Sequence, residues 1–110
     1  MKPASNAKLF TGALALDRFG PAHRFNTTLL RTGPLSSSGV LRGDLVVYGR
    51  GDPSFAARFN DGDVTRSLAP LVDAVTAAGI RRVEGGLIGD ESHFRGPPFG
   101  QGWTWDDLQY

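Results

Sequence analysis

A serine and a lysine three positions apart, Ser5 and Lys8, begin the first apolar run of this sequence, in the stretch PASNAKLF. A serine hydroxyl becomes a useful nucleophile only when a neighbouring base removes its proton. On a helix, residues i and i+3 lie on one face about 5–6 Å apart at Cβ, so a lysine amine can reach such a hydroxyl. Arginine stays protonated and cannot act as this base. The pair therefore predicts a nucleophile, Ser5, with Lys8 as its base.

Helix capping is the structural alternative for the same pair. Serine is a favoured N-cap residue, so Ser5 before an apolar helix needs no chemical explanation. A capping box would place Glu or Gln three residues later, and a lysine in the first turn opposes the helix dipole. Capping thus explains Ser5 and not Lys8. If the pair is catalytic, burial in an apolar helix and the nearby positive helix end would both favour a neutral amine at Lys8.

The helix that would carry the pair is expected over residues 5–18. Its apolar residues cover most of the circumference, which predicts burial on several sides. They are Leu9, Phe10, Ala13, Leu14 and Leu16. Gly20, as the residue after the helix, and Pro21 should end it.

Three segments with β-type patterns follow, and a second helix lies between the last two of them. Strands are expected over 24–32, 40–48 and 82–90, the first two as an antiparallel hairpin. The second helix is expected over 65–78, with Asp63 or Thr65 as its cap. Its apolar residues should share one face, and they are Leu68, Leu71, Val72 and Val75.

Composition bounds the class of protein. The chain has 110 residues, 40% of them hydrophobic and 21% charged, with a net charge of +1. This composition is typical of one globular domain or part of a larger one. The net charge is too small to indicate binding to nucleic acid. Cysteine is absent, which excludes disulfides and thiolate zinc sites. No stretch is long enough to span a membrane. The residues after Met1 lack a signal-peptide core, so an export signal would have to lie outside this sequence.

Other polar residues favour structural roles. His23 and His93 are far apart in the sequence and have no companion ligands, so packing or surface roles are expected rather than a metal site. The loop 49–53 lacks the Gly-Lys-Ser/Thr ending of a phosphate-binding loop and is expected to be a turn. Asp44 and Asp52 are expected at strand ends and turns.

Longer stretches resemble a known family. PASNAKLFTGALALDRFGPAHRFNTTLL is similar to the opening of the catalytic region of the D-alanyl-D-alanine carboxypeptidase/endopeptidase family, the penicillin-binding proteins of the penicillin-binding protein 4 (DacB) type, peptidase family S13. Members carry Pro-Ala-Ser-x-x-Lys, an apolar helix, Leu-Gly-Pro and an Arg-Phe-x-Thr strand. Residue 19 is Phe where Leu is commoner. GVLRGDLVVYGRGDPSF, GIRRVEGGLIGDESHF and GWTWDDLQY also match, in order.

The resemblance implies an α/β (α+β) fold. The chain would be a fragment of the penicillin-binding-protein/β-lactamase-like transpeptidase fold together with part of an inserted α/β domain. Residues 1–48 would hold the nucleophile helix and the strands that follow it in the transpeptidase-like domain. Residues 49–110 would begin the inserted domain.

The resemblance also implies an activity, that of a serine-type D-Ala-D-Ala carboxypeptidase or endopeptidase acting on peptidoglycan stem peptides. Ser5 would form an acyl-enzyme with Lys8 as base, and the Ser5 backbone N–H would be one oxyanion donor. β-Lactam antibiotics would acylate the same serine. No metal or other cofactor is implied, and the full-length protein would act in the periplasm or elsewhere outside the cytoplasm.

The family mechanism also uses a Ser-x-Asn triplet and a Lys-Thr-Gly motif, and neither occurs in this sequence. We therefore expect a fragment with little or no turnover of its own. Two alternatives stay open: another Ser-x-x-Lys hydrolase, such as a β-lactamase or esterase, and a non-catalytic module that binds the cell wall or a partner.

The last residues, 102–110, are rich in aromatic and acidic side chains. They could simply anchor a loop. In the family, an acidic residue of this segment can contact the amino-bearing side chain of the substrate. On that resemblance Asp107 is the candidate contact, with Trp103 and Tyr110 as walls of the substrate site.

Overall fold

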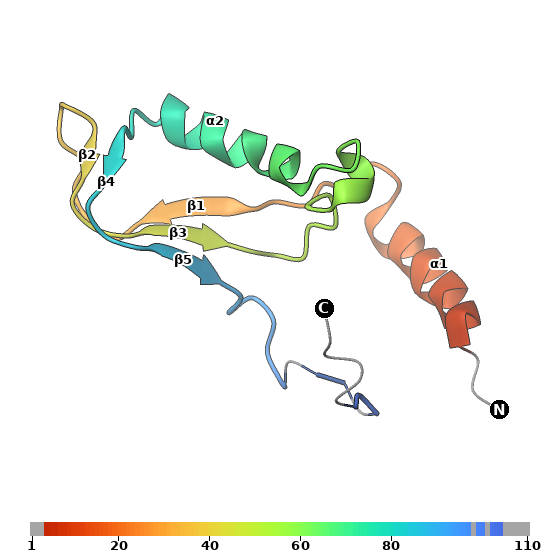
Figure 1. Cartoon of the computed structure of the whole chain (residues 1–110). Coiled ribbons are helices and arrows are strands. Elements are labelled where there is room, and N and C mark those ends of the chain that lie inside the picture. Colours follow the sequence, from red (N-terminus) through yellow and green to blue (C-terminus); the bar gives the residue numbers. More distant parts are fainter. Residues whose placement is uncertain (1–3, 98, 101, 105–110) are drawn as a thin grey trace.

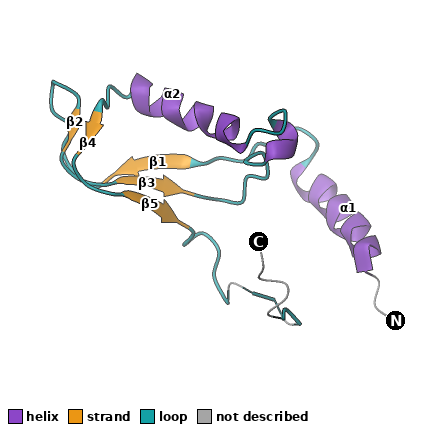
Figure 2. Cartoon of the chain, in the orientation of Figure 1, coloured by secondary structure: helices purple, strands orange, loops and turns teal. Residues whose placement is uncertain are grey.

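The computed structural model describes residues 4–97, 99–100 and 102–104, in which α1 is followed by three strands and α2 by two more (Figures 1 and 2). Short 3-10 helices span Ala4–Asn6, Ala57–Phe59 and Val64–Leu68. The main elements are α1 (Ala7–Phe19), β1 (Thr28–Arg31), β2 (Val40–Leu41), β3 (Leu45–Tyr48), α2 (Ala69–Ala77), β4 (Arg82–Val83) and β5 (Leu87–Asp90). The expected α+β character is confirmed.

Three strands form the main sheet, in the order β1-β3-β5. β1 and β3 are antiparallel with Thr28 opposite Tyr48, which confirms the predicted hairpin. β3 and β5 are parallel with Leu45 opposite Leu87, and α2 lies between them in the chain. Because a parallel pair needs a crossover connection, the helix makes this pairing possible.

The segments 40–48 and 82–90 each divide into two strands, where the sequence predicted one. β2 and β4 pair in parallel as a separate two-stranded sheet, and β3 and β5 continue into the main sheet. Glycines lie at the division. A Cβ at Gly85 would be 2.5 Å from both the Gly43 carbonyl oxygen and an Asp44 carboxylate oxygen, and one at Gly33 would overlap the Arg42 carbonyl. The neighbouring segments of the chain therefore approach too closely for a side chain at position 33 or 85.

Asp44 connects the segments that meet where the strands divide. We call this place the Asp44 junction (Thr32, Gly43, Asp44, Gly85 and Gly86). The Asp44 backbone N–H donates to the Thr32 hydroxyl at 2.8 Å, and the Thr32 N–H donates to the Asp44 carbonyl at 3.1 Å. The Gly86 N–H donates to the Asp44 carboxylate at 2.8 Å. Asp44 thus joins the end of β1, the start of β3 and the start of β5.

α2 runs alongside β1, an edge strand of the main sheet (Figure 1). The turn that leads into it is capped by Asp63, which accepts the Thr65 N–H at 2.8 Å, as expected. Hydrogen bonds from the Thr65 hydroxyl and backbone hold the pKa of the Asp63 carboxyl below its ordinary value. The predicted apolar face is only partly correct: Leu71 and Val75 are half-buried, whereas Leu68 and Val72 are exposed.

α1 extends away from the sheet (Figure 1). It ends at Phe19, and the Gly20 N–H, at a φ of 74°, donates to the Leu16 carbonyl, which confirms the expected stop. The predicted burial is wrong for the described residues: α1 has no buried residue, and Leu9 and Phe10 are 74% and 76% exposed. The described part of the chain leaves the apolar residues of α1 largely uncovered.

The main sheet draws β1 and β3 from residues before position 49 and β5 from residues after it. The division into 1–48 and 49–110 stays a prediction. Neither α1 nor α2 is long enough to cross a bilayer, and the same holds for every helix in the described part of the chain.

We expect Gly85→Ala to destabilise the protein by about 1–3 kcal/mol, because a methyl group would be forced against the Gly43 carbonyl and the Asp44 carboxylate. Gly89→Ala is the matched control, since Gly89 lies in β5 and no atom lies within 4 Å of the place that its added methyl group would take. Urea unfolding of both variants measures the effect. Equal stabilities of the two variants would contradict a close approach at the Asp44 junction.

Candidate active site

The Ser5 and Lys8 side chains meet at the start of α1. Lys8 Nζ lies 3.1 Å from Ser5 Oγ and donates to it. Ser5 belongs to the 3-10 helix that leads directly into α1, so the two residues keep helical spacing. A separation of this size is within the reach of a base that takes a proton from a hydroxyl.

Ser5 does not cap the helix. Asn6 occupies the N-cap position of α1, and no side chain there accepts a backbone hydrogen bond. The Ser5 hydroxyl is instead paired with Lys8. The preceding residue, Ala4, has a φ of 48°, in the left-handed region that a residue with a Cβ seldom adopts. The structure therefore pairs the Ser5 hydroxyl with Lys8, the residue whose presence helix capping does not explain.

Both side chains are exposed. The burial that was expected to favour a neutral Lys8 amine is absent from the described residues, in which α1 has no buried residue. The spacing of Ser5 and Lys8 suits a nucleophile and its base. No apolar enclosure surrounds the pair among the described residues.

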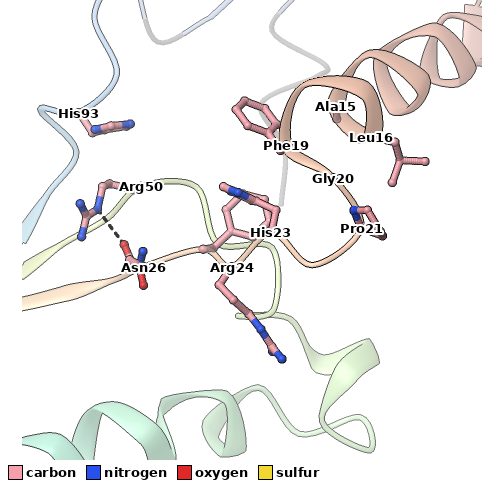
Figure 3. Close-up of a pocket in the computed structure, with 11 residues that line it drawn as sticks. Ala15, Leu16, Phe19, Gly20, Pro21, His23, Arg24, Asn26, Arg50 and His93 are labelled. Atoms are coloured by element: carbon pink, nitrogen blue, oxygen red, sulfur yellow. Dashed lines mark hydrogen bonds between the residues drawn. The ribbon is translucent and has the colours of Figure 1, made fainter.

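At the opposite end of α1 lies a pocket of about 540 Å³. It contains both histidines, although they are seventy positions apart in the chain (Figure 3). His23 packs between Phe19 and Phe25, with ring centroids 4.9 and 5.2 Å away. The expected packing role of His23 is confirmed, and its neighbourhood with His93 was not expected from the sequence.

His93 follows β5 and is held beside the end of β3. Its Nδ1 lies 3.3 Å from the Tyr48 hydroxyl, and its ring packs edge-on against Tyr48 and Phe94. Asp90 fixes the turn that precedes it by accepting the Ser92 N–H at 2.9 Å. Hydrogen bonds from the Ser92 hydroxyl and backbone hold the pKa of the Asp90 carboxyl below its ordinary value.

Arg50, in the loop 49–53, is a residue that sequence reasoning missed. Its Nε donates to the Asn26 carbonyl at 2.8 Å and its Nη2 to the Thr28 hydroxyl at 2.5 Å. The guanidinium also lies 5.4 Å from the centre of the Tyr48 ring. No local pattern marks this arginine, because its partners are more than twenty residues earlier in the chain.

The expected turn roles of the other acidic residues are confirmed. Asp52 accepts the Ser54 N–H at 2.9 Å and thereby closes the turn after Arg50. Asp44 holds the strand starts, as described above. Within the described ranges, no three His, Cys, Asp or Glu side chains gather in a way that could hold a metal ion.

Of the predicted substrate contacts, only Trp103 belongs to the described residues. Its ring packs against Phe99 at 5.7 Å between centroids and is 52% exposed. Asp107 and Tyr110 lie outside the described residues. Their roles stay predictions.

The chain was compared with known proteins. All of it, residues 1–110, matches the model of the D-Ala-D-Ala carboxypeptidase 3 (S13) family. The chain belongs to the S13 family. It is 34% identical over 108 residues to a D-alanyl-D-alanine carboxypeptidase of Actinomadura sp. (strain R39), covering 98% of this chain and 18% of that protein.

A second S13 relative is the D-alanyl-D-alanine carboxypeptidase DacB of Haemophilus influenzae, 35% identical over 109 residues, with 98% of this chain and 21% of that protein covered. The crystal structure of penicillin binding protein 4 (dacB) from the same organism superposes with a TM-score of 0.73 at 34% identity. That match covers 98% of this chain and 22% of that one. The chain thus spans about a fifth of the length of the S13 relatives it matches.

Asp90 gives a pH-dependent prediction. Because its pKa is lowered in the folded state, the stabilisation is present above the unfolded value of about 3.9 and is lost as the pH falls through the folded value. We expect an NMR titration to place the Asp90 pKa below that of an unstructured aspartate. We also expect Asp90→Asn to reduce the loss of stability on acidification.

Asp73→Asn is the control, since Asp73 is exposed on α2 and its side chain has no hydrogen bond or ion pair among the described residues. An Asp90 pKa at or above the ordinary value would contradict the turn described here.

Proposed function

We propose that this chain supplies the nucleophile of a serine-type D-Ala-D-Ala carboxypeptidase or endopeptidase, with Ser5 as the nucleophile and Lys8 as its base. The observation that carries the proposal is the 3.1 Å separation between Lys8 Nζ and Ser5 Oγ in a chain of the S13 family. Ten of the twelve basic residues are arginines that cannot deprotonate a serine, yet the residue beside Ser5 is a lysine.

The reaction follows from the roles of the two groups. The neutral Lys8 amine takes the hydroxyl proton as Ser5 Oγ attacks the carbonyl carbon of the penultimate D-alanine. The Ser5 backbone N–H donates to the oxyanion that forms. The carbon–nitrogen bond then breaks, the leaving amine takes the proton from Lys8, and water hydrolyses the resulting ester. A β-lactam ring would open in the same way and leave its acyl group on Ser5.

The substrate in this proposal is a peptidoglycan stem peptide, so the full-length protein would act in the periplasm or elsewhere outside the cytoplasm. Asp107 would contact an amino-bearing side chain of that peptide, between walls formed by Trp103 and Tyr110. Turnover would need the Ser-x-Asn and Lys-Thr-Gly groups that this sequence lacks, and we expect little from the 110 residues alone.

A chimera tests the nucleophile. In the DacB protein of Haemophilus influenzae, the aligned residues would be replaced by this sequence, which covers 21% of that protein. We expect fluorescent penicillin to label the chimera covalently and Ser5→Ala to abolish the labelling, because Lys8 hydrogen-bonds to no other hydroxyl in the described residues. Gel fluorescence measures the label.

Ser37→Ala, in the exposed loop before β2, is the matched control and should leave the labelling unchanged. Labelling that survives Ser5→Ala would exclude Ser5 as the nucleophile. A folded chimera that never acquires label would count against the proposed function as a whole.

The base is tested by Lys8→Arg in the same chimera. Arginine keeps the positive charge but cannot take up a proton, so we expect acylation by penicillin to slow by about 100-fold or more. The acylation rate constant from a labelling time course measures this change. A rate within a few-fold of the parent would show that charge alone, and not proton transfer, is required at position 8.

A further inference from the structure

The pocket at the end of α1 is built where three segments meet. β1 runs antiparallel to β3, and β3 runs parallel to β5. The residues before β1 and those after β3 and β5 therefore lie at one end of the sheet. His23 and Asn26 precede β1, Arg50 follows β3 and His93 follows β5. All four line the pocket together with the end of α1.

One side of the pocket carries the basic side chains of Arg50 and His93. Arg50 is held in place through Asn26 and Thr28, while its Nη1 makes no hydrogen bond within the described ranges. Figure 3 shows Arg50 and His93 on the side of the pocket opposite α1, with the Arg50 guanidinium turned toward Asn26. No aspartate or glutamate is among the lining residues. A guanidinium and imidazoles without a carboxylate partner are suited to an anion.

The other side is apolar and aromatic. Leu16 and Phe19 of α1 and Phe25 line it, and His23 packs between the two phenyl rings. Phe19 and Phe25 are 64% and 48% exposed, so their rings remain available to a ligand. Ligand sites of this size are typically mostly apolar, with a few convergent polar groups that set the orientation.

We propose that this pocket binds a small organic carboxylate with an apolar body, a ligand distinct from the one that Ser5 would attack. The carboxylate would contact Arg50, His93 and His23, and the apolar body would lie on Phe19 and Phe25. The pocket is at the far end of α1 from Ser5, about 20 Å away at 1.5 Å per residue. The proposal therefore does not depend on the proposed catalytic function.

The chain contains only two histidines, and both line the pocket, so imidazole NMR signals report on it directly. Benzoate is the probe, benzamide is its uncharged counterpart and inorganic phosphate is an anion without an apolar body. In mildly acidic buffer, we expect benzoate to shift both imidazole signals with a dissociation constant on the order of 1 mM, as suits a ligand of this size. Benzamide and phosphate should bind at least several-fold more weakly.

His23→Phe keeps an aromatic ring between Phe19 and Phe25 and removes one imidazole, and His93→Gln removes the second imidazole. Each should weaken benzoate binding at least threefold, as followed through the remaining histidine. Arg82→Gln in β4, at the other end of the molecule from α1, is the matched control and should have no effect (Figure 1). Ser5→Ala should also leave benzoate binding unchanged.

Absence of any shift throughout the millimolar range would overturn the proposal. Equal binding of benzamide would show that the cations do not select the ligand, and equal binding of phosphate would show that the aromatic side does not. Either result would also overturn it. A chimera that loses penicillin labelling with Ser5→Ala while benzoate fails to bind would separate this proposal from the catalytic one.

Discussion

The close approach of three chain segments at the Asp44 junction is the constraint on which the rest of this structure depends. The Asp44 carboxylate accepts the Gly86 N–H, and the Asp44 backbone is hydrogen-bonded to Thr32. Glycine at 85 allows the two chains to come this near. Because Asp44 holds the starts of β3 and β5 level with each other, the parallel register follows, and so does the level at which the two strands end.

That register has effects at the far end of the sheet. Since Tyr48 lies opposite both Thr28 and Asp90, Arg50 and His93 emerge side by side from neighbouring strands. The Arg50 contacts with Asn26 and Thr28 then fix the segment that comes down from α1. The pocket is therefore a long-range product of the packing around Asp44, with no side chain shared between the two places.

Local patterns in the sequence predicted the local features well. The stop at Gly20, the cap at Asp63, the hairpin of β1 and β3 and the strand-helix-strand order depend on neighbouring residues, and all are confirmed. The pairing of Ser5 with Lys8 likewise needs only helical spacing. These features follow from short-range sterics and hydrogen bonding, which a short window of sequence contains.

Features set by distant segments were missed or wrong. His93 meets Tyr48 from 45 positions away, and Arg50 meets Thr28 from 22, so no window of sequence joins them. The division of the segment 40–48 into two strands depends on the approach of Gly85 from another segment. For α1, the apolar residues indicate that the helix requires a covering partner, but they do not identify it.

The exposure of α1 has a consequence for reactivity. A helix of 13 residues is marginally stable in water without packing, and burial of each large apolar side chain would add about 1.5–3 kcal/mol. The distance between Ser5 and Lys8 exists only while the first turn is wound. Folding of this helix and the pairing of Ser5 with Lys8 are therefore coupled. Under the proposed function, a surface that covers α1 would stabilise the helix and with it the reactive pair.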